Sequence, residues 1–199
     1  MQFRILDVRP LCRGFFRLDR YTVEHDAFSG GTLTVQREHL ERGDAVAVLL
    51  YDKGRDEVLL IEQFRIGPAV HNDEAWLVEV VAGMLDEGED AEDCARRECI
   101  EEAGYAPSRL TRLAEYYTTP GGSSERLTLY LGEVERQRPV ASGGGLDHEH
   151  EDIRVLWLSR TEAMRWLAAG RICSGTPMLA LLLAFGRPAE MSGTGPSRP

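Results

Sequence analysis

The sequence has no hydrophobic run long enough to cross a membrane. Its longest apolar run, Met178 to Phe185, has eight residues, whereas a membrane-spanning helix needs roughly 20. The first residues also lack the apolar segment behind a basic start that marks a secretory signal. Only four cysteines are present, none in a Cys-x-x-Cys pair, which argues against a disulfide framework. We therefore expect a cytoplasmic protein with reduced thiols and no membrane partner.

Positive charge is also scarce. The chain has 23 Lys and Arg residues against 33 Asp and Glu residues, a formal net charge of −10. Nucleic-acid-binding proteins rely on clustered Lys and Arg to neutralise phosphates, so this balance argues against a nucleic-acid partner. A polyanionic substrate would need a cation between itself and such a protein. The glycine motifs of dinucleotide-binding and P-loop proteins are missing, so no cofactor beyond a metal is implied.

The remaining composition, 43% hydrophobic and 28% charged residues in a chain of 199, is typical of a globular protein. Strand-like and helix-like segments alternate, which predicts an α/β (α+β) fold with a mixed β-sheet and helices on its faces. We expect residues 1–43 to form an N-terminal β region, 44–186 the main domain, and 187–199 a mobile Pro/Gly/Ser-rich tail. Strands of the main domain are expected at 45–51, 58–61, 76–82, 110–117, 126–133 and 153–158.

Three helices are expected in the main domain. The first covers about 90–103 and ends at Gly104, because glycine suits the left-handed position after a helix. The second covers 159–170 and begins with a Ser-x-x-Glu capping box. The third covers 178–185 after Thr176, which we expect to be its N-cap.

The first of these helices carries a cluster of negative charge. On a helical wheel Glu98, Glu101 and Glu102 continue the face that begins with the small residue Cys94. Mutual repulsion, the negative end of the helix dipole and desolvation all make this arrangement unfavourable without a counter-ion. Arg97 relieves only part of the charge, whereas a hard divalent ion such as Mg²⁺ or Mn²⁺ would neutralise all three carboxylates. On spacing alone, a solvated acidic face paired with neighbouring arginines is the alternative.

The stretch 83–105 as a whole reads G-x5-E-x7-R-E-x-x-E-E-x-G and resembles the Nudix box of the Nudix hydrolases. It departs from the family at Cys99, which is usually aliphatic, and at the closing apolar position, Tyr105; both side chains are apolar enough to pack. The resemblance implies the Nudix α/β/α sandwich and cleavage of a nucleoside diphosphate linked to another group. The matching positions are Gly83, Glu89, Arg97, Glu98, Glu101, Glu102 and Gly104.

The resemblance also implies a metal centre. Divalent metal would be held by Glu98 and Glu102, with help from Glu101 and from the backbone carbonyl of Ala82. Arg97 would orient a glutamate rather than contact the substrate.

A glycine-rich acidic loop, residues 143–152, would complete the site. Within the resemblance Glu149 takes the position of the base that deprotonates the attacking water, and Glu151 that of a residue that joins the metal shell. A solvated acidic loop is the alternative. His148 and His150 flank the base, but they have no nearby third ligand for zinc.

A second pattern narrows the substrate. Pro120 follows Gly104 by sixteen residues in a Thr-Pro-Gly-Gly-Ser-Ser-Glu context that is similar to the ADP-ribose pyrophosphatase subfamily, although alone it would be a plain turn. The resemblance covers roughly residues 10–185 and implies that Phe15 and Phe16 stack on the adenine, with core packing as the other reading. It further implies a homodimer that exchanges its N-terminal region, so that several substrate contacts come from the partner. The other implied contacts are Arg37, Glu38, Arg42, Arg65, Met84, Thr119, Pro120, Gly121 and Glu125.

We therefore predict Mg²⁺-dependent hydrolysis of ADP-ribose to AMP and ribose 5-phosphate, with the water activated by Glu149. One alternative is a hydrolase of another nucleoside diphosphate sugar, such as GDP-mannose or UDP-glucose. Another is a sensor that binds ADP-ribose without cleaving it. The complete set of carboxylates and the lack of a basic helix-turn-helix segment weigh against the sensor.

Overall fold

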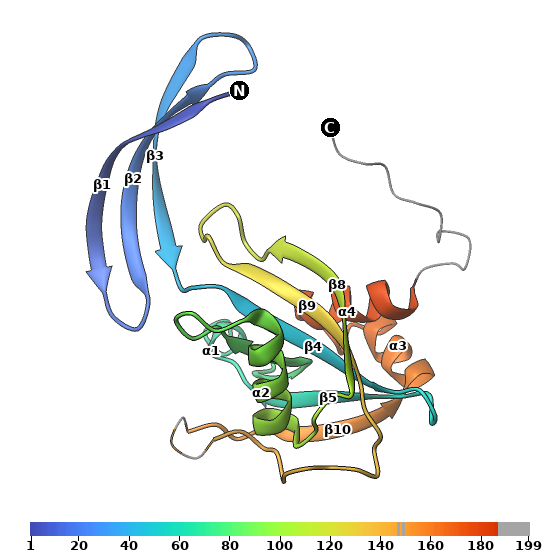
Figure 1. The fold of residues 1–199 in the computed structure, drawn as a ribbon. Coiled ribbons are helices and arrows are strands. Elements are labelled where there is room, and N and C mark those ends of the chain that lie inside the picture. Colours follow the sequence, from blue (N-terminus) through green and yellow to red (C-terminus); the bar gives the residue numbers. More distant parts are fainter. Residues whose placement is uncertain (147, 149, 187–199) are drawn as a thin grey trace. The chain divides into compact units, whose positions relative to one another are not determined.

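The computed structural model describes residues 1–146, 148 and 150–186, and the expected tail at 187–199 lies outside the described residues. The chain divides into two compact units. The first contains Met1–Ala45 and Glu115–Leu127, and the second contains Val46–Ala114 and the described residues from Thr128 onward. Figure 1 traces the elements of both units along the chain.

The first unit is built on a three-stranded antiparallel sheet in the order β1-β2-β3. Its strands are β1 (Phe3–Arg13), β2 (Arg17–Asp26) and β3 (Thr32–Glu41). Among the residues of these strands only Asp19 is buried, where it forms ion pairs with Arg13 and Arg17. The expected N-terminal antiparallel β region is confirmed, but this sheet has no apolar core of its own.

The second unit contains most of a larger sheet with the strand order β10-β5-β4-β9-β8. A chain segment that follows β5 returns to this sheet as two short strands, of which β6 pairs with β5 and β7 with β4. This change of partner explains why the single strand expected at 76–82 is interrupted at Val80. The strands are β4 (Ala45–Asp52), β5 (Glu57–Phe64), β6 (Trp76–Glu79), β7 (Val81–Met84), β8 (Arg109–Tyr117), β9 (Arg126–Glu133) and β10 (Arg154–Ser159).

The larger sheet is covered on both faces, as the α/β/α sandwich requires. On one face α2 (Ala91–Ala103) packs Cys94 and Cys99 into a buried cluster with Ile61 of β5 (Figure 1). Strand residues of the opposite parity, Leu49 and Leu60, are fully buried as well, so the other face is also excluded from water. The remaining helices are α1 (Ile66–Ala69), α3 (Arg160–Ala168) and α4 (Gly175–Phe185). Among the helices of the described residues, none is long and apolar enough to cross a membrane.

Most helix boundaries follow local sequence signals. Helix α2 ends at Gly104, which has a left-handed φ of 79°, and the Ser159 hydroxyl of α3 accepts from the Glu162 N–H at 3.2 Å. The expected N-cap of α4, Thr176, is wrong, because the helix begins earlier and the Met178 N–H donates to the Ser174 carbonyl at 3.3 Å. The short helix α1 was not expected from the sequence, since four residues are too few to show helical periodicity.

Replacing Gly104 by Ala should destabilise the second unit. Its backbone is left-handed, and an added Cβ would lie 2.5 Å from the Ala141 carbonyl oxygen. We expect the free energy of unfolding to fall by about 2–4 kcal/mol in urea denaturation. The control is Gly175→Ala, because beyond its own helical backbone and chain neighbours no heavy atom lies within 4 Å of its added Cβ. Equal urea midpoints for the two variants would contradict the prediction.

Candidate functional site

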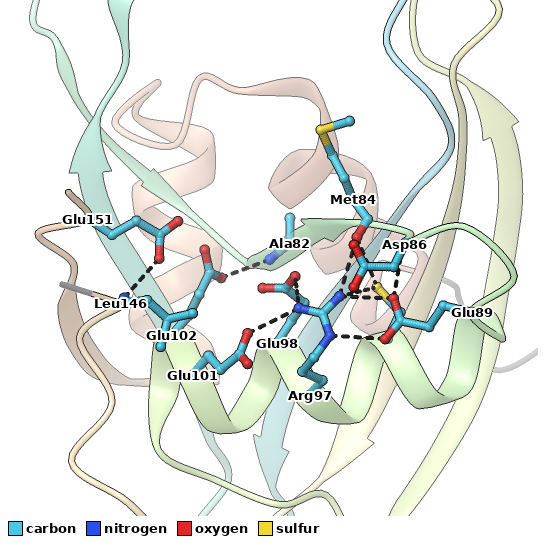
Figure 2. A network of polar contacts seen from close by, with 11 residues as sticks. Ala82, Met84, Asp86, Glu89, Arg97, Glu98, Glu101, Glu102, Leu146 and Glu151 are labelled. Atoms are coloured by element: carbon cyan, nitrogen blue, oxygen red, sulfur yellow. Dashed lines mark hydrogen bonds and ion pairs between the residues drawn. The ribbon is translucent and has the colours of Figure 1, made fainter. Parts of the chain in front are cut away.

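Arg97 links the carboxylate of Glu89, which precedes α2, to two carboxylates of that helix (Figure 2). Its Nε and Nη2 donate to the two carboxylate oxygens of Glu89, each at 2.9 Å. Its Nη1 donates to Glu98 Oε1 at 2.7 Å and to Glu101 Oε2 at 3.0 Å. The bidentate hydrogen bonds from Arg97 lower the pKa of Glu89 to about 2. Because every nitrogen of the guanidinium is engaged, Arg97 is suited to orient the glutamates rather than to bind a ligand.

Glu102 is buried without a contact to this arginine. Only 2% of the residue is exposed, and its Oε2 accepts from the Ala82 N–H at 2.9 Å. Burial is the largest cause that raises the pKa of Glu102 to about 8; the Ala82 hydrogen bond opposes this rise, and the charges of Glu98 and Glu151 add to it. Burial also raises the pKa of Glu98, in spite of its ion pair with Arg97. The site therefore buries more carboxyl groups than its own cations can hold in the charged form.

Gly83 allows one of these carboxylates to reach the sheet. A Cβ added at Gly83 would lie 1.9 Å from Oε1 of Glu98 and 2.0 Å from its carboxyl carbon. Any larger residue at this position of β7 would therefore displace the Glu98 side chain. The glycine that opens the matched motif thus has a direct steric role in the carboxylate cluster.

The acidic loop is fastened to the same helix. The N–H groups of Gly144 and Gly145 donate to the backbone carbonyls of Glu102 and Glu101, at 2.8 and 3.1 Å. The side chain of Glu151 turns back into the loop, where its Oε2 accepts from the Leu146 N–H at 3.2 Å (Figure 2). The expected base, Glu149, lies outside the described residues.

The donor set fits a hard divalent cation. Its side-chain donors are carboxylates, and Ala82, whose carbonyl is the expected additional ligand, is hydrogen-bonded to one of them. Among the described residues, no three side chains of His, Cys, Asp or Glu are close enough to form a ready ligand set. The fit therefore rests on buried carboxylates with too few counter-charges, and not on a preformed cage.

The predicted aromatic contacts lie in the first unit and are open to solvent. Phe15 is 87% exposed and Phe16 is 37% exposed, with their rings edge to face at a centroid distance of 4.9 Å. The guanidinium of Arg42 lies 5.5 Å from the centre of the Phe16 ring. Their exposure contradicts the alternative that both are core residues. Of the other predicted contacts on this sheet, Glu38 pairs with Arg20 at 2.8 Å, and Arg37 donates to the neighbouring Gln36 carbonyl.

The Pro-Gly-Gly segment of the first unit forms a tight turn. The N–H groups of Gly122 and Ser123 donate to the Thr119 carbonyl at 3.1 and 3.0 Å, which encloses Pro120 and Gly121. Glu125 follows this turn and is buried, with one carboxylate oxygen 3.0 Å from Arg42 Nε and the other bound by the Thr118 hydroxyl. Within this unit, Phe16, Arg42 and Glu125 are therefore connected by direct contacts.

Two predicted contacts lie in the second unit. Met84 is 36% exposed and its carbonyl accepts from Arg97 Nη2 at 3.3 Å. Arg65 follows β5, and its Nε donates to Glu79 Oε2 at 2.7 Å. Glu79 was not predicted from the sequence, and neither was Gln63, a buried residue whose Nε2 has no hydrogen-bond partner among the described residues. Alternation along the strand could have placed Gln63 on the face of Arg65, but nothing in the sequence pairs Glu79 with that arginine.

A cavity of about 1050 Å³ in the second unit contains none of the predicted metal ligands. Its lining mixes apolar side chains with four acidic residues and two arginines, and this mixture identifies no ligand. The charged lining residues include Glu62, Asp73, Glu74, Asp152, Arg154 and Arg171.

Comparison with known proteins matches residues 41–174 to a family model described as NUDIX domain. The ADP-ribose pyrophosphatase of Escherichia coli (strain K12) is 46% identical over 179 residues, which cover 89% of this chain and 85% of that protein. The GDP-mannose pyrophosphatase of Pectobacterium atrosepticum is 37% identical over 178 residues, 89% of this chain and 91% of that protein. A solved structure described as an ADP compounds hydrolase has the same fold, with a TM-score of 0.72 at 21% identity and coverage of 92% of each chain.

Replacing Glu102 by Gln should change how stability depends on pH. The raised pKa keeps a proton on folded Glu102 from its ordinary value of 4.5 up to about 8, so metal-free wild-type protein should lose stability as pH rises through this window. Gln is uncharged and its amide oxygen can accept from Ala82 N–H, so the variant should lack this loss. At about pH 8.5 it should be more stable by about 1–3 kcal/mol.

Urea unfolding in EDTA between about pH 5 and pH 9 measures this dependence. Glu92→Gln, on the exposed part of α2, is the matched control and should keep the wild-type pH dependence. An unchanged dependence in Glu102→Gln would show that the buried carboxyl does not titrate in this window.

Proposed function

This chain belongs to the Nudix family, and we propose that it hydrolyses the diphosphate of ADP-ribose to AMP and ribose 5-phosphate in the presence of Mg²⁺. The proposed substrate rests on the similarity of this chain to ADP-ribose pyrophosphatases over most of its length. The carboxylate cluster of α2 supports the metal, because it buries more carboxyl groups than Arg97 alone can hold in the charged form. Mn²⁺ has the same preference for oxygen ligands and is the second candidate.

The residues proposed to hold the metal are Glu98, Glu101, Glu102 and Glu151, together with the backbone carbonyl of Ala82. When bound, Mg²⁺ supplies the positive charge that neutralises the diphosphate and makes the attacking water more acidic. Arg97 keeps Glu98 and Glu101 in place through the hydrogen bonds from Nη1.

The proposed base is Glu149, which accepts a proton from the attacking water. The water oxygen forms a bond to one phosphorus, and the bond from that phosphorus to the bridging oxygen breaks. AMP and ribose 5-phosphate leave as the two products. The hydrogen bonds of Gly144 and Gly145 to the helix carbonyls support this role, because they hold the start of the 143–152 loop beside the helix that carries the carboxylates.

The first unit is proposed to bind the adenosine part of the substrate. The exposed rings of Phe15 and Phe16 offer faces on which adenine can stack. Arg37, Glu38 and Arg42 are the proposed polar contacts, with Thr119, Pro120, Gly121 and Glu125 from the turn segment. Arg65 and Met84 are the proposed contacts from the second unit.

One alternative substrate has a specific observation in its favour. GDP-mannose pyrophosphatases also align with most of this chain, at 34% to 37% identity. The reaction, the metal and the carboxylates would be the same, and the base and sugar would differ. A sensor that binds ADP-ribose without cleavage is disfavoured, because such a protein has no need for the complete carboxylate set.

Incubation with ADP-ribose should give AMP and ribose 5-phosphate with Mg²⁺ and no products in EDTA. Glu98→Gln should lower kcat by about 100-fold or more, because a buried ligand charge is lost. Glu92→Gln is the matched control on the same helix and should keep wild-type turnover. Chromatography of the products measures both. Faster cleavage of GDP-mannose than of ADP-ribose would contradict the proposed substrate. Binding of ADP-ribose without any cleavage would support the sensor alternative.

We also propose a homodimer that exchanges its N-terminal region. All eleven residues of β1 are exposed, and covering an apolar face stabilises a small sheet of this kind. The large apolar side chains exposed on it include Phe3, Ile5, Val8, Leu11 and Leu33.

The exposed free thiols of Cys12 and Cys173 suit a reducing compartment, and we propose the cytoplasm. The boundaries 1–43 and 44–186 are kept as the proposed domains.

Light scattering after size-exclusion chromatography should give twice the chain mass of 22.2 kDa. Replacing both Phe3 and Ile5 by Ser removes two exposed apolar side chains from one face of β1 and should shift the protein toward the monomer. Arg4→Gln, on the opposite face of the same strand, is the control and should leave the dimer intact. A monomeric wild-type protein would refute the proposed dimer.

A further inference from the structure

Arg65 and Glu79 form an ion pair beside the carboxylate cluster. Arg65 Nε lies 2.7 Å from Glu79 Oε2, and 43% of the arginine side chain but only 13% of the glutamate side chain is exposed. The backbone of Arg65 is fixed as well, since its N–H donates to the Ala75 carbonyl at 2.8 Å. In this pair, the largely buried carboxylate of Glu79 holds the Nε atom of a partly exposed guanidinium.

Both residues lie on the face of the sheet that α2 covers. Ile61 of β5 packs into the core cluster with α2, and Glu79 is its direct partner across the β5–β6 pairing. Paired residues on neighbouring strands point to the same face. Arg65 is also close enough to Glu102 of α2 that its charge lowers the pKa of that carboxyl. The guanidinium therefore belongs to the surroundings of the proposed metal ligands.

Glu79 binds Arg65 in a way that leaves most of the N–H donors of the arginine unused. An arginine has five N–H donors, one on Nε and four on the two Nη atoms. In the part of the chain that the structure describes, the only hydrogen bond of the Arg65 guanidinium is the one from Nε to Glu79. The two Nη groups are therefore left together as the edge that binds phosphate oxygens in a bidentate manner.

We propose that Glu79 is a positioning residue, which fixes the Arg65 guanidinium so that its two Nη groups bind the diphosphate of the substrate. This inference rests on the proposed function, because it assumes a diphosphate ligand at this site. Glu79 acts through Arg65 and does not contact the substrate itself. Because the arginine is already ordered before the substrate binds, less conformational entropy is lost when the complex forms.

The sign of the effect separates this role from simple electrostatics. A carboxylate beside an anion-binding arginine repels a diphosphate, so its removal should tighten binding if charge alone mattered. If Glu79 positions the arginine, its removal should weaken binding instead. A purely structural ion pair would change the stability of the protein and leave KM unchanged.

The chain offers a matched control one strand pair away. Glu62 of β5 forms an ion pair with Arg154 of the neighbouring strand β10. Glu62 alternates with Ile61 along the strand and so lies on the opposite face, where it lines the 1050 Å³ cavity. Both carboxylates pair with an arginine, but only Glu79 faces the proposed site.

The test compares Glu79→Leu with Glu62→Leu in steady-state hydrolysis of ADP-ribose. We expect Glu79→Leu to raise KM by about tenfold with kcat within about twofold of wild type, and to weaken binding of a non-hydrolysable methylene analogue by a similar factor. Glu62→Leu should leave KM within about twofold. In an Arg65→Ala background, Glu79→Leu should have no further effect on KM, because the glutamate acts through that arginine.

An unchanged or lower KM in Glu79→Leu would overturn the positioning role, and so would a rise in KM that persists in full in the Arg65→Ala background. Should Glu79→Leu fail to fold, Arg65→Lys answers the same question, because lysine keeps the charge but has no paired donors. Wild-type KM in Arg65→Lys would then overturn the role. Wild-type protein that neither cleaves ADP-ribose nor binds the analogue would refute the proposed function, which distinguishes the two failures.

Discussion

The burial of more carboxylates than cations at one end of α2 is the constraint on which the site depends. Arg97 engages three glutamates, yet Glu102 remains outside its reach and so deeply buried that its pKa rises to about 8. A protein folded for its own stability alone would gain by replacing such a group with an apolar one. The arrangement makes physical sense when a cation completes it, and the unfavourable free energy of the metal-free site is then part of the affinity for that cation.

The surrounding fold brings backbone groups to this cluster rather than further charges. Strand β7 contributes the Ala82 N–H to Glu102 and the open space at Gly83 to Glu98. The loop after β9 contributes the N–H groups of Gly144 and Gly145 to the last carbonyls of α2. These contacts satisfy polar groups at a helix end that would otherwise be left without partners. They also hold strand, helix and loop in one fixed arrangement around the carboxylates.

Local sequence signals are sufficient where the determining interaction is itself local. The N-terminus and the end of α2 follow from Asp90, which caps the helix, and from the left-handed Gly104. The spacing of Glu98, Glu101 and Glu102 is enough by itself to place them on one face of the helix. The pairing of Arg65 with Glu79 joins residues fourteen positions apart through a strand that changes partner, and no periodic pattern encodes that pairing. The start of α4 was also missed: the N-cap is Ser174, and its side chain makes no capping hydrogen bond that would mark it as the cap.

Arg97 and Arg65 show how one side-chain type supports two roles in the same unit. Each has Nε bound by a glutamate, Glu89 in one case and Glu79 in the other. Arg97 continues with hydrogen bonds from both Nη atoms to groups of the protein, so its donors are used up within the fold. For Arg65, the described residues contain no such acceptors for the Nη atoms. A chain with a net charge of −10 can therefore bind an anion locally, because binding depends on which donors remain available and where they point, and not on the overall charge.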